Sequence, residues 1–235
     1  MASPILITGA SQRLGLAMAQ SLLEEGYAVV VTFRTLRPTI EKLIEKGATA
    51  LYADFSTEQA IDRAIDDIKA ASKDYRAIIH NASDWAQEKD HDDKHGLFNR
   101  MMNVHAVAPY RINQALAGML SSRDGFSDII HMTDYVQEIG SEKHMAYAAS
   151  KAALHNLTLS FAKKLAPHVK VNSIAPALLM FNENDDDTYK QKALKKSLLE
   201  TVPGAQEAVK AMHYLLNSDY VTGQTLHLNG GRHLK

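Results

Sequence analysis

Three residues near the middle of the chain have the types and spacing for proton transfer. Tyr147 and Lys151 lie four residues apart in a segment whose apolar positions continue with helical spacing to Leu165, so phenol and ammonium share one face of a predicted helix. Because a nearby cation stabilises the phenolate, we expect the pKa of Tyr147 to fall below its ordinary value. Asp134 precedes the tyrosine by thirteen residues and follows a strand-like run. A surface pair on an amphipathic helix is the alternative, so the surrounding elements must decide.

The first of these elements is an apolar run at residues 4–8 that leads into a glycine-bearing turn and then a helical pattern. Such a turn is a site for phosphate, because unpaired backbone NH groups and the helix dipole both face the incoming anion. Gly9 allows the tight turn and Gly15 lets the helix approach the strand. Arg13 stands where the pattern GxxxGxG has its middle glycine, so a plain strand-to-helix turn stays open as an alternative.

The second predicted strand, residues 28–33, ends at Arg34 and Thr35 with no carboxylate nearby. Dinucleotide-binding folds place Asp or Glu about 20 residues beyond the glycines to bind the ribose of NAD, whereas an arginine accommodates the 2′-phosphate of NADP. Arg34, helped by Arg13, therefore favours NADP(H). Two solvated arginines would instead predict no preference between the cofactors.

Strands and helices alternate along the rest of the chain. Further apolar, strand-like runs lie at residues 48–54, 76–80, 128–133, 169–174 and 221–228. This alternation predicts one Rossmann-type, doubly wound α/β domain over residues 1–235, with a seven-stranded parallel sheet and helices on both faces. Ligands bind such sheets beyond the carboxyl ends of the strands, where Arg34, Asp54, Asn81 and Asp134 all fall. Asp54 can accept from an adenine amino group or help to cap the following helix at Ser56 or Thr57.

Composition narrows the class of protein. The net charge is −1 and no long basic run is present, so we expect no nucleic-acid or membrane partner. Cysteine is absent, which excludes disulfides and agrees with a reducing cytoplasm. Glycine interrupts residues 1–10 too early for a signal peptide or a spanning helix. We expect a cytoplasmic protein.

Four motifs along the chain together resemble the short-chain dehydrogenase/reductase family. They are TGxxxxxG at residues 8–15, NAS at 81–83, YxxxK at 147–151 and IAP at 174–176, and they span essentially the whole chain. The family resemblance implies a homotetramer, a nicotinamide cofactor and no metal. His91 and His95 are a candidate metal pair, but no third and fourth ligand stands nearby.

Departures from the family pattern are informative. Asp134 replaces the usual serine, Arg13 replaces the middle glycine, and the NAS motif is followed by Asp84 and Trp85. This combination is similar to the pteridine reductase branch of the family. It implies an NADPH-dependent oxidoreductase that acts on the C=N bond of a dihydropterin, converting 7,8-dihydromonapterin to tetrahydromonapterin, with weaker activity on dihydrofolate.

The resemblance assigns roles to individual residues. Asp134, Tyr147 and Lys151 would be catalytic, with the pKa of Asp134 raised in a partly desolvated pocket and Lys151 holding the nicotinamide ribose. The residues implied to bind NADPH are Thr8, Gly9, Ser11, Gln12, Arg13, Leu14, Gly15, Arg34, Thr35, Asp54, Phe55, Asn81, Ala82, Ser83, Tyr147, Lys151, Pro176 and Leu178. Those implied to bind the pterin are Arg13, Ser83, Trp85, Asp134, Tyr147 and Leu179.

Several features keep two interpretations. Trp85 would lie flat on the pterin, or would pack in the core, although its polar surroundings favour the pocket. Residues 179–200 read as a lid over the substrate or as a solvated surface, with a lysine-rich helix at 188–199 capped by Asp187. His105 stands where many relatives carry an asparagine that binds a water, and it either holds that water or packs in its helix. Residues 232–235 can reach a neighbouring subunit.

Two other functions compete with pterin reduction. A carbonyl reductase, such as a 3-oxoacyl reductase, shares the cofactor turn and the YxxxK motif, but Asp134 and Trp85 count against it. A non-catalytic NADP-sensing protein on the same fold would commonly lack the tyrosine or the lysine, and both Tyr147 and Lys151 are present.

Overall fold

The protein is built on one sheet of seven parallel strands in the order β3-β2-β1-β4-β5-β6-β7. The computed structural model describes residues 3–120 and 125–235. The strands are β1 Ile5–Ile7, β2 Val29–Phe33, β3 Thr49–Tyr52, β4 Ala77–His80, β5 Ser127–Met132, β6 Val169–Pro176 and β7 Thr225–Leu228. Every residue of β1, β4, β5 and β6 is buried, because helices cover both faces of a parallel sheet. The predicted fold class is confirmed.

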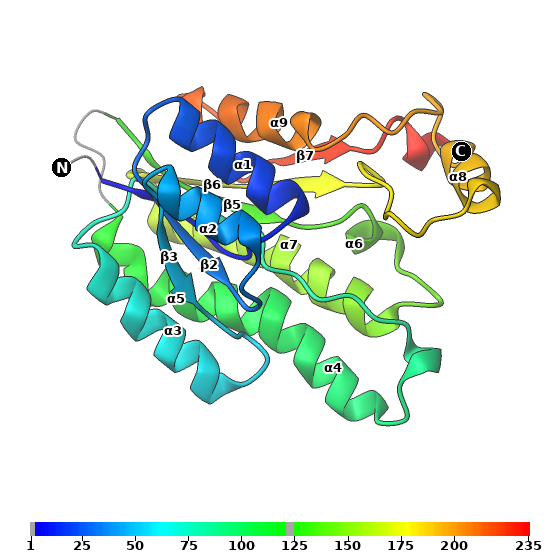
Figure 1. Ribbon diagram of the computed structural model, residues 1–235, viewed down its shortest axis with the longest axis horizontal. Helices are drawn as coiled ribbons and strands as arrows, with labels where there is room; N and C mark the ends of the chain where they lie inside the picture. Colours follow the sequence, from blue (N-terminus) through cyan, green and yellow to red (C-terminus); the bar gives the residue numbers. More distant parts are fainter. Residues whose placement is uncertain (1–2, 121–124) are drawn as a thin grey trace.

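Two layers of helices enclose the sheet. Apolar residues of α1, α2 and α9 pack on one face, and those of α3, α5 and α7 pack on the other; Figure 1 shows α1 and α9 above the sheet and α3, α4 and α5 below it. The longer helices are α1 Arg13–Glu24, α2 Pro38–Glu45, α3 Glu58–Ala71, α4 Lys94–Met102, α5 Ala108–Leu116, α7 Met145–Leu165, α8 Asp187–Leu194 and α9 Gln206–Asn217. A short helix, α6, spans Val136–Ile139.

Residues 94–119 do not form one continuous helix. A π-helical turn at Asn103–Val107 separates α4 from α5, and a 3₁₀ turn at Ala117–Met119 follows. Pro109 explains the interruption, because proline has no NH to donate and its ring displaces the carbonyl one turn earlier. The turn places His105 on the inside of the protein, where it is 1% exposed.

The lysine-rich helix is shorter than the predicted 188–199. α8 begins at Asp187 and ends at Leu194, and the capping residue is Asp186, whose carboxylate accepts from the Tyr189 NH at 2.7 Å. Ala193 is the only buried residue that α8 contributes. A helix with so little apolar surface to bury gains little from a further turn.

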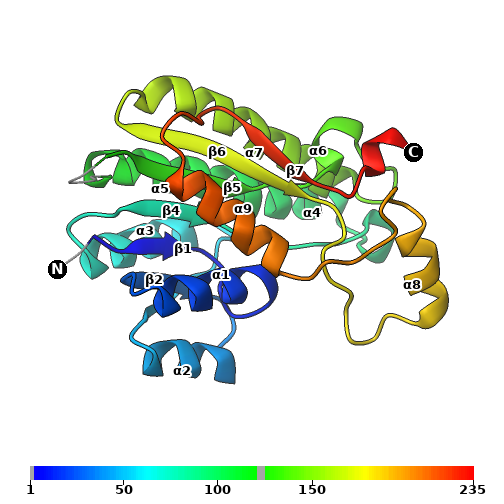
Figure 2. The same cartoon turned by 90° about the horizontal axis from the view of Figure 1, so that it is seen from above.

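The order of the strands creates the crevice in which ligands bind. β1 pairs with β2 on one side and β4 on the other, so the chain reverses its direction of winding at β1. Crevices of this kind lie beyond the carboxyl ends of the strands at the switch point. Figures 1 and 2 both show α8 and the C-terminus at the same end of the molecule, and in Figure 2 they lie beyond the ends of β6 and β7. Within residues 3–120 and 125–235, no helix has the length and apolar character needed to cross a membrane.

Candidate active site

Side chains and backbone lock the glycine turn after β1 to the end of β4. The Thr8 hydroxyl accepts from the NH groups of Asn81 and Ala82, both at 3.0 Å, and the Asn81 amide donates to the carbonyls of Thr8 and Gly9. Gly9 has φ +70°, and a Cβ there would lie 2.7 Å from Ala82 Cα. Only glycine satisfies both conditions, so the backbone at the switch point stays open to an incoming phosphate.

The next part of the turn explains why Gly15 is glycine although Arg13 is not. A Cβ on Gly15 would lie 2.4 Å from Asn81 Nδ2 and 2.5 Å from the backbone oxygen of Gly9, which cannot move aside. Arg13 adopts φ +53°, a left-handed conformation that costs a non-glycine residue about 1–2 kcal/mol. Its guanidinium donates to Asn182 Oδ1 at 2.8 Å and to Met180 O at 3.1 Å. Arg13 therefore connects the cofactor turn to the segment that follows β6. A glycine at this position has no side chain and could not make these contacts.

A cavity of about 150 Å³ opens beside this turn. Nine of the residues predicted to bind the cofactor line it: Gly9, Ser11, Gln12, Arg34, Thr35, Asp54, Phe55, Ala82 and Ser83. Arg37 also lines the cavity, although it is not among the residues predicted to bind the cofactor. Its position three residues after Arg34 could have indicated this role. Asp54 accepts from both the NH and the hydroxyl of Ser56 at 3.0 Å, while Thr57 caps α3.

Two arginines converge on Asp84 at one side of the site. Asp84 Oδ2 lies 3.7 Å from Arg34 Nη1 and 3.3 Å from Arg100 Nε. Arg34 is half exposed, so its ion pair with Asp84 contributes little stability. An anionic group of a ligand can therefore take the place of Asp84 as the partner of Arg34.

Asp134, Tyr147 and Lys151 meet at the carboxyl end of β5. Tyr147 Oη donates to Asp134 Oδ2 at 2.9 Å, and the Val136 NH donates to the other carboxylate oxygen at 2.9 Å. Lys151 is 2% exposed; its ammonium donates to Met132 O at 2.9 Å and lies 5.6 Å from the centroid of the Tyr147 ring. The three residues that the sequence singled out therefore share one desolvated site.

Burial has the largest effect on the pKa values of Asp134, Tyr147 and Lys151. It raises the pKa of Asp134 above its ordinary value, as predicted, with the Val136 hydrogen bond and the Lys151 charge acting in the opposite direction. The predicted fall in the pKa of Tyr147 is wrong: burial and the neighbouring Asp134 carboxylate raise that pKa well above its ordinary value. Burial lowers the pKa of Lys151 to about 8. The best acid of the three is consequently the carboxyl group.

His105 forms the centre of a buried chain of hydrogen bonds. The Asp84 NH donates to Nε2 at 3.1 Å, so this nitrogen is the acceptor and Nδ1 carries the proton. Nδ1 lies 2.8 Å from Ser150 Oγ, which donates to Tyr147 O at 2.7 Å. Ser83 Oγ also lies 2.9 Å from Nε2. Burial, followed by the Lys151 charge, lowers the pKa of His105 well below its ordinary value, which keeps the ring neutral.

Replacing His105 should therefore cost stability. In His105→Ala, the Asp84 NH and the Ser150 hydroxyl lose a buried partner, and we expect the free energy of unfolding to fall by about 2–4 kcal/mol. Urea denaturation at pH 7 measures this, with the exposed His95→Ala as the control. A loss within about 0.5 kcal/mol of the control would show that this chain does not stabilise the site.

Trp85 lies outside the core, as its polar surroundings in the sequence favour, but it has a ring partner that was not predicted. Its side chain is 59% exposed, which excludes core packing. The indole packs against the His144 ring at a centroid distance of 4.4 Å and an interplanar angle of 37°, and His144 Nδ1 lies 2.8 Å from Ala86 O. No sequence feature predicts this contact, because residues 85 and 144 belong to separate loops.

The predicted binding residues after β6 do not line the cavity beside the glycine turn; Leu178 and Leu179 line a separate cavity. Leu179 is 5% exposed and belongs to the core cluster on the α1 and α9 face. Pro176 O accepts from the Tyr135 NH at 3.1 Å, and Leu178 is partly buried. The Lys235 ammonium donates to the carbonyls of Lys195 and Ser197 in its own chain.

The comparisons with known proteins agree with this geometry. A family model described as Enoyl-(Acyl carrier protein) reductase matches residues 9–233. The chain belongs to the short-chain dehydrogenase/reductase family. It is 52% identical over 233 residues to the dihydromonapterin reductase of Klebsiella pneumoniae, covering 99% of this chain and 97% of that protein. It is 50% identical over the same length to the dihydromonapterin reductase of an Escherichia coli strain, with the same coverage.

A solved structure extends the comparison. The chain is similar to FolM Alternative dihydrofolate reductase 1 from Brucella canis complexed with NADP, at 25% identity and a TM-score of 0.86, covering 99% of this chain and 94% of that one. The resemblance to the pteridine reductase branch, which rested on four motifs and three departures, is confirmed by these relatives.

Proposed function

We propose that the protein is an NADPH-dependent oxidoreductase that reduces 7,8-dihydromonapterin to tetrahydromonapterin, with weaker activity on dihydrofolate. The observation that carries the proposal is the 2.9 Å hydrogen bond between Tyr147 and Asp134, a carboxyl group of raised pKa. Ketone reduction in this family uses a hydroxyl at that position to orient a carbonyl. A carboxyl group can instead supply a proton to a ring nitrogen, which C=N reduction requires.

The cavity beside the glycine turn suits NADPH. Arg34 and Arg37 both line it and can bind the 2′-phosphate, while the open backbone at Gly9 accepts the pyrophosphate. Lys151 would hold the nicotinamide ribose. When bound, NADPH supplies the hydride that is transferred to C6 of the pterin.

The protein's own residues handle the proton. N5 takes up one proton as C6 takes up the hydride, which balances the reduction of one C=N bond. Tyr147 Oη would donate to N5. With Asp134 protonated, the hydrogen bond between the two residues can run from carboxyl to phenol, and the carboxyl group then replaces the proton that Tyr147 gives up. Trp85 supplies an exposed aromatic face against which a planar pterin can stack.

Turnover tests the function directly. The decay of NADPH absorbance is followed with 7,8-dihydromonapterin, dihydrofolate or an acetoacetyl thioester as the substrate. We expect the fastest decay with dihydromonapterin, slower decay with dihydrofolate and none with the thioester. Decay with the thioester alone would identify a carbonyl reductase, and tight NADPH binding without any decay would identify an NADP-sensing protein.

Cofactor preference tests Arg34. The wild-type protein should prefer NADPH to NADH, and Arg34→Ala should raise KM for NADPH about 10-fold or more, because a charge-assisted contact to phosphate is lost. KM for NADH should change by less than about 2-fold. Arg63→Ala, an exposed arginine on α3, is the control. A wild-type preference for NADH would refute the NADP assignment.

Three further features belong to the same proposal. We infer that the protein works in the cytoplasm and assembles as a homotetramer, as the family resemblance implies. The segment 179–200 would act as a lid over the substrate, and the Arg13 contacts with Met180 and Asn182 support this by linking the cofactor turn to the start of that segment.

A further inference from the structure

A second cavity, of about 300 Å³, lies on the far side of the segment that follows β6. We call it the C-terminal pocket. Its walls come from the end of β6, the stretch after α8, the start of α9 and the residues around β7 and the C-terminus. Its polar lining residues are Lys196, Ser197, Thr201, Glu207, His227, Asn229 and Arg232. None of them was assigned a role in substrate or cofactor binding above.

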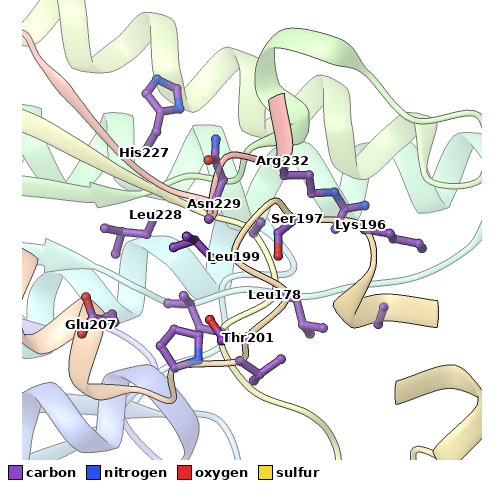
Figure 3. A pocket seen from close by; sticks show the side chains of 16 residues that line it. Leu178, Lys196, Ser197, Leu199, Thr201, Glu207, His227, Leu228, Asn229 and Arg232 are labelled. Carbon is purple, nitrogen blue, oxygen red and sulfur yellow. The ribbon is translucent and has the colours of Figure 1, made fainter. Parts of the chain in front are cut away.

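The lining of this pocket carries more positive than negative charge, with Lys196 and Arg232 against Glu207. Glu207 pairs with Lys210 at 2.6 Å, and His227 Nε2 lies 3.4 Å from Glu138. Lys196 and Arg232 make no ion pair with any residue in the part of the chain that the structure describes. Figure 3 shows these two side chains on the same side of the pocket, with Glu207 on the opposite side in that view.

Arg232 connects the pocket to the proposed chemistry. Its guanidinium carbon lies 4.2 Å from the centroid of the Tyr135 ring, and Tyr135 directly follows Asp134. The Arg232 charge is close enough to Asp134 to act against the rise in the pKa of that carboxyl group. One cation therefore lines the pocket and also acts on the carboxyl group that would resupply the proton to Tyr147.

The position of the substrate then follows from its own structure, on the basis of the proposed function. C6 of a pterin is bonded to N5, so a side chain on C6 begins beside the Asp134 and Tyr147 pair. Arg232 is next to that point, and the C-terminal pocket extends beyond it. We infer that the C-terminal pocket is a subsite for an anionic group on the C6 side chain of the pterin, with Arg232 and Lys196 as the cations that bind it.

Two kinds of pterin carry an anionic group on the C6 side chain. Dihydrofolate carries carboxylates on its glutamyl tail, and a dihydropterin phosphate ester carries a phosphate. Dihydromonapterin has a neutral polyhydroxylated side chain and serves as the reference. Arg232→Gln and Lys196→Gln remove one charge each while keeping a polar side chain.

The decisive quantity is the ratio of KM for dihydrofolate to KM for dihydromonapterin. We expect each variant to raise this ratio about 10-fold, because one charge-assisted hydrogen bond is lost. A 3′-phosphate ester of dihydromonapterin, used in place of dihydrofolate, shows whether phosphate or carboxylate is favoured. Lys69→Gln is the control: it removes one charge from an exposed lysine on α3, on the opposite face of the sheet, and should leave the ratio unchanged.

A second measurement does not depend on turnover. Calorimetric titration with p-aminobenzoylglutamate, the tail of folate without the pterin, should show binding to the wild-type protein. Binding to the double variant, which combines Arg232→Gln and Lys196→Gln, should be at least about 10-fold weaker. An unchanged KM ratio in both variants, or equal binding of the fragment to wild type and double variant, would overturn the subsite. Failure of the wild type to reduce any pterin would overturn the proposed function instead, and the fragment titration would still decide the subsite.

Discussion

Tyr147→Phe should lower kcat for 7,8-dihydromonapterin by about 10³-fold, within the range that positioned proton transfer contributes. The ring itself stays: it packs edge-on against His105 at 5.4 Å and belongs to a small buried cluster with Leu97, Met101 and Ala146. Only the hydroxyl that donates to Asp134 is removed. NADPH should therefore bind to the variant within about 3-fold of the wild-type Kd, measured by cofactor fluorescence.

The role of Tyr147 is tested by comparing the change in kcat with the change in the Kd for NADPH. Tyr110→Phe, an exposed tyrosine on α5, is the matched control and should turn over like the wild type. If Tyr147→Phe keeps full activity, the phenol is not in the proton path. If NADPH binding weakens as much as kcat falls, the residue holds the cofactor rather than the proton.

The sheet and the glycine turn could be predicted because each depends on residues that are close in the sequence. Strands buried on both faces are almost entirely apolar, and the turn after β1 needs glycine at Gly9 for its φ of +70° and at Gly15 because a Cβ there would lie 2.5 Å from Gly9 O. Parallel strands bring their carboxyl ends to one edge, so Asp54, Asn81 and Asp134 could be placed together without knowing any side-chain contact. The predicted lid, tetramer and residue roles stay predictions.

Contacts that join separate elements could not be predicted. His105 bridges the loop after β4 and α7 only because the π-helical turn points it inward, and a second chain links His80, Asn113, His131 and Thr158 across β4, α5, β5 and α7. The pKa of Tyr147 was mispredicted for a related reason. The spacing to Lys151 indicated a cation, but the degree of burial and the position of the Asp134 carboxylate, which outweigh it, depend on the folded structure.

Asp134→Asn should lower kcat for 7,8-dihydromonapterin by about 10²-fold and change its dependence on pH. The amide oxygen can still accept from Tyr147, but the side chain can no longer hold a proton. Because burial raises the pKa of Asp134, the wild-type carboxyl group stays protonated to a higher pH than an ordinary aspartate. The kcat of the wild type should thus be highest below that raised pKa and should decline as the pH rises through it, whereas the kcat of the variant should be low and flat over the same range.

Two companions make this result specific to Asp134. Glu138→Gln changes a carboxylate four residues away that lies 3.4 Å from His227, and it should keep the wild-type pH profile. Asp134→Ser restores the serine usual in the family and should impair pterin reduction far more than NADPH binding. A decline above about pH 8 that persists in Asp134→Asn belongs to another group, and Lys151, with its pKa lowered to about 8, is the candidate. Full activity in Asp134→Ser, or an unchanged pH profile in Asp134→Asn, would show that the proton reaches N5 without this carboxyl group.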